Sequence, residues 1–143
     1  MANTENSRFI PGSVCERTLL VEPEMSAAAL GNDGVEVLAT PILVQYLEMV
    51  AIACIESMLE KGEASLGTSI SVQHLAATPV GGHVRFRAEL KSVAGRRLGY
   101  ELEATDDVEL VATGHHERVV VDLQRFLDGV AKKQGRIETV SRS

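Results

Sequence analysis

The chain has 143 residues, a formal net charge of −6 and 45% hydrophobic residues, which is the composition of one soluble globular domain. Aromatic residues make up only 3%, and with the acidic charge this argues against nucleic-acid binding, which needs basic and stacking surfaces. The first residues lack the pattern of a signal peptide, and no uninterrupted apolar run reaches the ~18–20 residues of a membrane span. We therefore expect a cytoplasmic protein with neither nucleic acid nor membrane as a partner.

The N-terminal part of the chain predicts one strand and a flexible connection. Residues 1–12 are polar and end in Pro-Gly, as in a loose arm. Residues 13–23 favour a strand that stops at Pro23. Residues 24–38 are rich in small residues and glycine, which predicts a mobile connection with at most a short helical turn.

The clearest helix covers residues 40–62. Thr40 is suited to the N-cap, Pro41 to the first helical position and Gly62 to the stop. The middle of this helix is apolar nearly all round, which is typical of a helix buried on every side. One sheet covers only part of such a helix, so we expect a second copy of the chain to cover the rest, in an obligate homodimer.

After this helix the apolar period changes to two, which indicates strands. Four strands are expected: 64–78, 81–93, 98–106, and 108–123 with a bulge near Gly114. A short amphipathic helix at 124–135 and a loose end at 136–143 follow. This order favours an α+β hot-dog fold, an antiparallel β-sheet wrapped around a long central α-helix, as a single domain over 1–143. We expect the strand at 108–123 to form an exposed edge that pairs across a two-fold axis.

Two titratable residues stand where the pattern asks for apolar ones. Glu48 lies within the apolar helix, where an unpaired carboxylate costs several kcal/mol. His74 continues the inward phase of Ile70 and Val72. Each alone is as well explained by a structural role, but an inward histidine facing a helix with a buried carboxylate predicts an acid/base pair.

Thr40 is a third candidate. A hydroxyl at a helix start is explained by capping alone, but it also lies beside free N–H groups and the positive end of the helix dipole, which stabilise an oxyanion. Thr40 and Glu48 are eight residues apart, about 12 Å along a helix axis, so they do not touch directly. We expect His74, or a group from a partner subunit, to bridge them.

The stretch "GHHERVVV" at 114–121 places two histidines next to each other. His115 and Glu117 fall on one strand face, and His116 and Arg118 on the other. A solvated strand, or a strand with cross-strand ion pairs, is the favoured interpretation of His115, His116 and Glu117. Their spacing matches no metal site. Nor do the two cysteines of the chain suggest a disulfide framework or a zinc site, and we expect no metal and no cofactor.

Several of these stretches together resemble the fluoroacetyl-CoA thioesterase-like family of hot-dog proteins. They are "LATPILVQYLEMVAIACI", "GEASLGTSISVQHLAATPVG", "AELKSVAGRRL" and "GHHERVVVDLQRF", which span most of residues 38–127. The resemblance implies hydrolysis of a short-chain acyl-CoA thioester by Thr40, Glu48 and His74, in a dimer with CoA near the interface. It further implies that Gly67 lets the thioester approach the backbone, and that Arg118 lies near the site.

One departure from the family concerns the acyl group. The fluoroacetyl-selective enzymes carry aromatic rings in the segment before the catalytic threonine, whereas "AAALGNDGVEVLAT" has none. Thioester hydrolysis is therefore expected without a specific acyl group. Two alternatives remain open: a non-catalytic acyl-CoA-binding hot-dog module, and a hot-dog hydratase or dehydratase.

Overall fold

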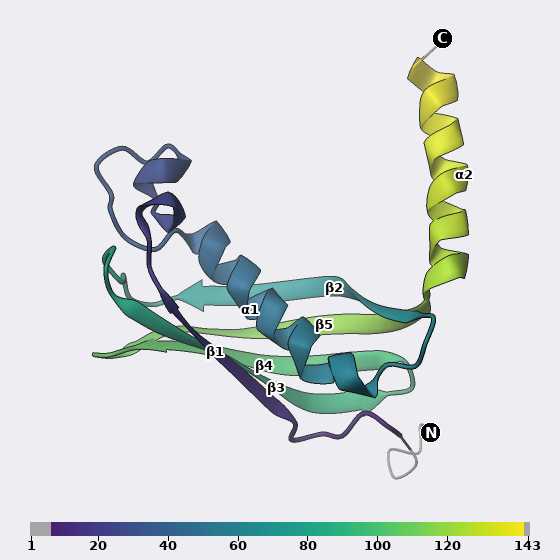
Figure 1. The fold of residues 1–143 in the computed structure, drawn as a ribbon, viewed down its shortest axis with the longest axis horizontal. Coiled ribbons are helices and arrows are strands. Elements are labelled where there is room, and N and C mark those ends of the chain that lie inside the picture. The colour runs from purple at the N-terminus through teal and green to yellow at the C-terminus, as the bar shows by residue number, and fades with distance from the viewer. Residues whose placement is uncertain (1–6, 142–143) are drawn as a thin grey trace.

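A computed structural model describes residues 7–141 of the chain (Figure 1). Five strands form one antiparallel sheet in the order β1-β3-β4-β5-β2. The helices and strands, with three 3₁₀ turns (η), are β1 (Val14–Leu20), η2 (Pro23–Met25), η3 (Ala28–Leu30), α1 (Thr40–Ile55), η4 (Glu56–Met58), β2 (Glu63–His74), β3 (His83–Ala94), β4 (Arg97–Asp106), β5 (Leu110–Asp122) and α2 (Leu123–Ser141). The predicted α+β hot-dog architecture is confirmed.

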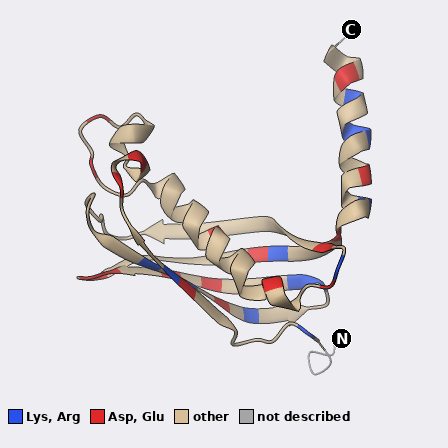
Figure 2. Cartoon of the chain, viewed as in Figure 1, with Lys and Arg blue, Asp and Glu red and all other residues tan. Residues whose placement is uncertain are grey.

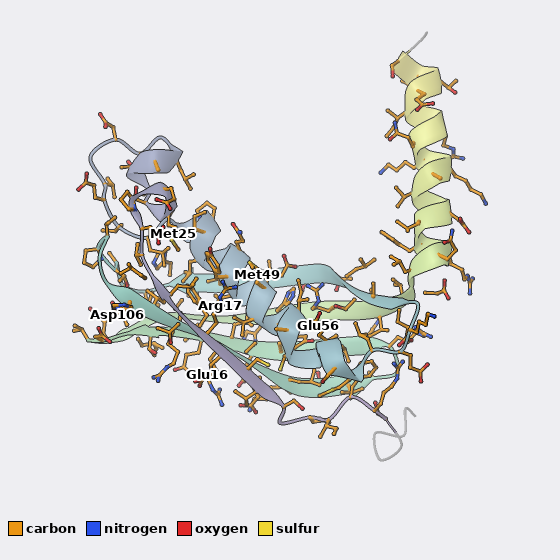
Figure 3. The ribbon with its side chains drawn as sticks, in the orientation of Figure 1. Glu16, Arg17, Met25, Met49, Glu56 and Asp106 are labelled. Atoms are coloured by element: carbon orange, nitrogen blue, oxygen red, sulfur yellow. The ribbon has the colours of Figure 1, made fainter. Side chains whose placement is uncertain are left out.

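Helix α1 packs on one face of the sheet and supplies much of the core. Its sheet-facing side chains, such as Leu43, Leu47 and Ile55, are fully buried. The side that carries Met49 (Figure 3) and Ile52 stays open, with 38% and 40% of these residues exposed. The all-round burial that the sequence predicts is therefore not achieved within one chain.

The N-cap of α1 lies one residue earlier in the chain than the sequence predicts. Ala39, rather than Thr40, occupies the N-cap position, and Pro41 lies in the first turn. Thr40 is thus the first helical residue, and its hydroxyl is free of capping. The helix with its following turn, Thr40–Met58, is by length and composition apolar enough to cross a membrane, a test that core helices of soluble proteins pass as well.

The predicted edge strand is wrong. β5 lies inside the sheet, because His116 is paired with Tyr100 of β4 on one side and with Ile70 of β2 on the other. β2 is therefore the edge on that side. The predicted bulge at Gly114 is also wrong: the register shifts between Gly67 and Ser69 instead.

The ends of the described chain are more ordered than the sequence predicts. Within the predicted loose arm, Arg8 forms an ion pair with Glu63 of β2, and Phe9 is buried with 3% exposure. Residues 1–6 lie outside the described residues. At the other end, α2 continues to Ser141 rather than ending at 135, and only 142–143 of the predicted loose end lie outside the description.

Candidate active site

Thr40 and His74 meet where α1 begins and β2 ends. The backbone before Thr40 is fixed because Leu38 N–H donates to the carbonyl of Thr78 and Ala39 N–H donates to that of Met25. Thr40 Oγ1 then lies 2.8 Å from His74 Nδ1. If Nδ1 accepts this hydrogen bond, the neutral ring carries its proton on Nε2, and the hydroxyl proton points at a base. Serine and threonine nucleophiles are activated by this arrangement.

The pair opens into a groove of about 330 Å³. The groove is formed by the segment before α1 and by the chain after β2, and its lining is small and apolar apart from the reactive pair and one amide. The lining residues are Ala27, Asn32, Val35, Val37, Leu38, Ala39, Thr40, His74, Leu75, Ala76 and Ala77. Because none of these is Phe, Tyr or Trp, the groove lacks a large aromatic side chain to clamp a small acyl group.

His74 has an unsatisfied nitrogen at this site. Among the described residues, its Nε2 is buried without a hydrogen-bond partner. A buried polar atom of this kind costs free energy unless a ligand or another group pairs with it. Nε2 is therefore available for a hydrogen bond to a substrate, a water molecule or a group from a second subunit.

A second polar cluster lies farther along α1. Arg118 Nη1 lies 3.0 Å from Glu48 Oε2, and the remaining donors of Arg118 bind Ser65 through its hydroxyl (3.0 Å) and its carbonyl (2.8 Å). Arg118 is only 4% exposed, whereas the Glu48 side chain keeps 42% of its surface. The guanidinium is therefore a fixed, buried anchor, and the carboxylate it holds remains open to the surface.

His116 completes this cluster from beneath. Its Nδ1 lies 2.7 Å from the carbonyl oxygen of Ser69, which only accepts, so Nδ1 carries the proton. Nε2 then accepts from Arg118 Nη1 at 3.1 Å and lies 3.7 Å from Glu48 Oε2. Burial lowers the pKa of His116 below its ordinary value, and the Arg118 charge lowers it further, although the Ser69 carbonyl and Glu48 oppose them. Neutral His116 thus keeps Arg118 directed at Glu48.

Gly67 leaves room for the Glu48 carboxylate. A Cβ at residue 67 would overlap Glu48 Oε2 and would lie 3.3 Å from Arg118 Nη1. The absence of a side chain leaves room for the carboxylate against the β2 backbone. The glycine that the resemblance assigns to substrate approach therefore also has a steric role beside Glu48.

The structure brings the candidate residues together in two groups rather than one. His74 contacts Thr40 as expected, but in the part of the chain that the structure describes no hydrogen bond joins His74 to Glu48. The sequence interpretation missed His116, which it assigned to a solvated strand and which is 1% exposed. Its shared strand face with Arg118, already placed near the site, was the available signal.

The sheet and helix are those of hot-dog proteins. A hot-dog-like protein from Thermanaerovibrio acidaminovorans, 24% identical, superposes over 92% of this chain and 97% of its own with a TM-score of 0.84. A Thermus thermophilus protein of the thioesterase superfamily, 26% identical, covers 91% of this chain and 96% of its own with a TM-score of 0.85. These likenesses define the architectural class.

Closer relatives define the family. The family model for fluoroacetyl-CoA-specific thioesterases matches residues 21–124. The fluoroacetyl-CoA thioesterase of Streptantibioticus cattleyicolor is 45% identical over 98 residues, which are 68% of this chain and 70% of the relative. A solved structure of the fluoroacetyl-CoA thioesterase FlK is 37% identical, with a TM-score of 0.80 over 87% of this chain and 97% of its own. This chain belongs to the fluoroacetyl-CoA-specific thioesterase family, as the sequence resemblance indicates.

Proposed function

We propose that this protein hydrolyses a short-chain acyl-CoA thioester to the free acid and CoA, with Thr40, His74 and Glu48 as the catalytic residues. The observation that carries the proposal is the 2.8 Å contact between Thr40 Oγ1 and His74 Nδ1 at the mouth of the groove. Structures of relatives in complex with fluoroacetate and CoA, and with acetyl-CoA, support this substrate class. The reaction needs no cofactor.

In one mechanism Thr40 is the nucleophile. His74 Nδ1 takes the hydroxyl proton as Oγ1 attacks the thioester carbonyl carbon, and the resulting oxyanion lies near the N–H groups of the first turn of α1. The tetrahedral intermediate collapses by breaking the C–S bond, and the sulfur leaves as CoA thiol after accepting the proton. Water then hydrolyses the threonine ester and restores the hydroxyl.

In the other mechanism His74 or Glu48 activates water directly, and Thr40 positions the carbonyl. The two mechanisms differ in whether an acyl group is ever attached to the protein. Acid quenching under single-turnover conditions, followed by intact mass measurement, separates them. An acyl adduct on the peptide that contains Thr40 supports nucleophilic catalysis, and its absence during turnover supports activated water.

We propose that the enzyme is a homodimer joined through the β2 edges. β2 presents a free row of backbone groups, and Ile70 on this strand is 38% exposed. A two-fold axis near Ile70 in an antiparallel pair, with Thr68 as the extra residue of the bulge, puts residue 67 of one copy opposite residue 72 of the other. Glu48, which lies against Gly67, then lies beside Thr40 and His74 of the second copy, and this supplies the carboxylate that one chain does not.

The homodimer is tested by light scattering at micromolar concentration. A dimer supports the shared site. A monomer that retains full thioesterase activity contradicts it, because Glu48 then has no route to His74. We further place the protein in the cytoplasm, in keeping with its composition.

A panel of CoA thioesters tests the reaction itself. Release of free thiol from acetyl-, propionyl-, butyryl- and fluoroacetyl-CoA supports hydrolysis. A change in double-bond absorbance with enoyl-CoA supports a hydratase, and measurable affinity without turnover supports a binding module. Since the groove lining has no Phe, Tyr or Trp, we expect fluoroacetyl-CoA to be hydrolysed with little preference over acetyl-CoA.

A further inference from the structure

The C-terminal helix α2 is not explained by the thioesterase site. The family model ends at residue 124, whereas α2 runs from Leu123 to Ser141 and stands clear of the sheet beyond the β2 edge in Figure 1. Every residue of α2 is exposed in the single chain. Helices in proteins gain most of their stability from packing an apolar face rather than from intrinsic helix propensity. We therefore expect one face of α2 to be buried against another surface.

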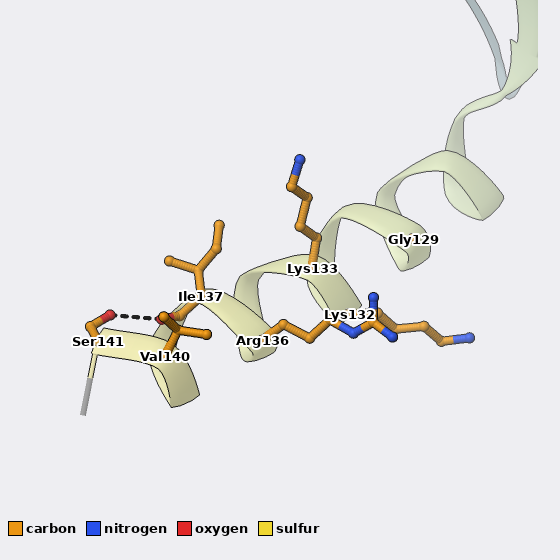
Figure 4. A pocket seen from close by; sticks show the side chains of 7 residues that line it. All are labelled: Gly129, Lys132, Lys133, Arg136, Ile137, Val140 and Ser141. Atoms are coloured by element: carbon orange, nitrogen blue, oxygen red, sulfur yellow. Dashed lines mark hydrogen bonds between the residues drawn. The ribbon is translucent and has the colours of Figure 1, made fainter. Parts of the chain in front are cut away.

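One side of α2 is apolar, and Lys133 lies at its border. Leu123, Leu127, Val130 and Ile137 recur on one face, each between 39% and 50% exposed. The helix carries four basic residues against two acidic ones, a net charge of +2 in a chain of −6 (Figure 2). Basic and apolar side chains together line a groove along the helix (Figure 4): Gly129, Lys132, Lys133, Arg136, Ile137, Val140 and Ser141.

A surface of complementary charge lies at the other end of the molecule. No lysine or arginine occurs from Thr18 to Glu60. The segment before α1, residues 22–38, has four exposed carboxylates, at Glu22, Glu24, Asp33 and Glu36. Exposed apolar side chains accompany them: Leu30 at 53%, Val35 at 37% and Leu75 at 57%. We name this surface, residues 22–38 with Leu75, the acidic end.

Within one chain α2 and the acidic end are far apart. α2 leaves the sheet beside Glu63, where Leu123 N–H donates to the Gly62 carbonyl. The acidic end lies at the opposite end of β2, beside His74. The twelve residues of β2 separate the two by about 40 Å at ~3.3 Å per residue. Any partner of matching chemistry for α2 therefore comes from another molecule.

The two-fold pairing of β2 edges brings these surfaces together. With the axis near Ile70 and Thr68 as the extra residue of the bulge, residue 63 of one copy lies opposite residue 76 of the other. The base of α2 is then beside Leu75 and Thr40 of the second copy, and α2 extends over that copy, since it points past the β2 edge. The two α2 helices stay at opposite ends of the paired strands, so they do not contact each other.

We propose that α2 packs against the acidic end of a second copy of this chain and forms one wall of the Thr40–His74 groove of that copy. This inference rests on the homodimer proposed above and extends it: each active site contains a helix from the other subunit. Apolar contacts cover the stripe of α2, and Lys133 and Arg136, on one flank of the stripe, face the carboxylates of the acidic end.

The first test locates α2 by cross-linking. Equal amounts of ¹⁴N- and ¹⁵N-labelled full-length protein are mixed, treated with a zero-length carbodiimide and digested. We expect mixed-isotope cross-links from Lys132 or Lys133 to Glu24, Asp33 or Glu36. Cross-links of α2 to α2, or none from α2 to the acidic end while light scattering shows a dimer, overturn the placement of α2 but leave the dimer intact. A monomer overturns both.

The second test is a charge exchange. Reversal of the charge on α2 in Lys132→Glu/Lys133→Glu should weaken dimerisation about tenfold, which corresponds to 1.4 kcal/mol. Adding Glu24→Lys/Asp33→Lys in the same chain should restore the affinity. Glu16→Lys on β1, at the opposite edge of the sheet, is the control and should change nothing. Failure of the exchange to restore affinity overturns the pairing.

Binding to phosphatidylglycerol vesicles tests lipid as the alternative partner of α2. If the protein binds the vesicles, and Lys132→Glu/Lys133→Glu abolishes this binding without changing the dimer affinity, the pairing of α2 with the acidic end is overturned in favour of lipid.

Discussion

The two polar clusters on α1 are built in opposite ways. At the start of the helix, Thr40 and His74 share one hydrogen bond, and His74 Nε2 has no partner among the described residues. In the middle of the helix, Arg118 forms hydrogen bonds with Ser65, Glu48 and His116, and His116 is tied to Ser69. The first cluster is under-satisfied and lines a groove, and the second is a satisfied network.

This difference separates reacting groups from the groups that hold a charge in place. A catalytic hydroxyl and base must be free to exchange partners, so their local contribution to stability is small. A carboxylate that must keep its orientation needs a support, and here the support is a buried guanidinium and a neutral imidazole. Substitutions in the first cluster should therefore affect turnover alone, and those in the second should affect turnover and stability together.

The largest effect is expected for the first cluster. His74→Ala should lower kcat by about 10²–10³-fold, because the base that activates Thr40 is lost. The Tm should stay within about 2 °C of wild type, since His74 contributes one satisfied nitrogen. Thiol-release kinetics and calorimetry measure the two quantities, and Gln73→Ala on the outer strand face is the matched control. Wild-type turnover in His74→Ala would eliminate the proposed constellation.

Arg118→Met should be the most destabilising change in the second cluster, at about 2–4 kcal/mol. It leaves Glu48 without its cation and the Ser65 carbonyl without its donor, and losing one member of a buried charged network is costly. Glu48→Gln should lose most of its kcat but only about 1 kcal/mol, because its side chain is partly solvated. Urea unfolding with parallel kinetics tests both. Equal stability losses in the two variants would contradict the support role of Arg118.

His116 gives a pH-dependent test of the same network. Its pKa lies below the ordinary value of 6.5, so below about pH 6.5 the unfolded chain binds more protons than the folded one. The free energy of unfolding should fall as pH drops from 6.5, and a protonated Nε2 should push Arg118 away from Glu48 and reduce kcat. His116→Gln keeps an acceptor for Arg118 and should flatten the pH dependence while retaining turnover, whereas His116→Leu should lose turnover at every pH. Identical profiles for the two variants would rule out the positioning role.

The smallest effect on stability is expected at Gly67. Gly67→Ala places a Cβ against Glu48 Oε2, and the flexible end of the glutamate can move aside. We expect a loss of less than about 1 kcal/mol together with a roughly tenfold fall in kcat, because the carboxylate is displaced rather than removed. Thermal unfolding and kinetics measure both, and Thr68→Ala next to it serves as control. A large loss of stability with unchanged kcat would show that Gly67 is purely structural.

The local pattern of apolar residues predicts most of the helices and strands. The period-two alternation of Val84, Phe86, Ala88 and Leu90 gave β3 within two residues, and the Pro41 signal gave the start of α1. Strand order did not follow, because alternation looks the same in an edge strand and in an internal one. The length of α2 was missed because the predicted helix ends at Gly135, although an exposed glycine costs a helix only about 1 kcal/mol.

The site residues likewise fall into those that the local pattern predicts and those that only the tertiary structure shows. Thr40, His74 and Glu48 stood out because each is polar in an apolar frame, and the Thr40–His74 contact is present as expected. His116 did not stand out, since a histidine pair on a strand places one ring on each face whichever face is buried. Only tertiary packing shows that the His116 side meets Arg118 and Glu48. The separation of Glu48 from His74 likewise follows from chain geometry beyond sequence spacing.

The strand order also has a consequence for synthesis of the protein. α1 ends at Ile55, and its main packing partner, β3, begins at His83, 28 residues later. β1 pairs with β3 and β2 pairs with β5, and in each pair the second strand is synthesised later. No strand can therefore pair before the middle of the chain has been made. At about 5–20 residues per second, the apolar helix leaves the ribosome seconds before β3, its main packing partner, is available. The nascent chain is thus most vulnerable to aggregation while its N-terminal half is complete and its sheet is not.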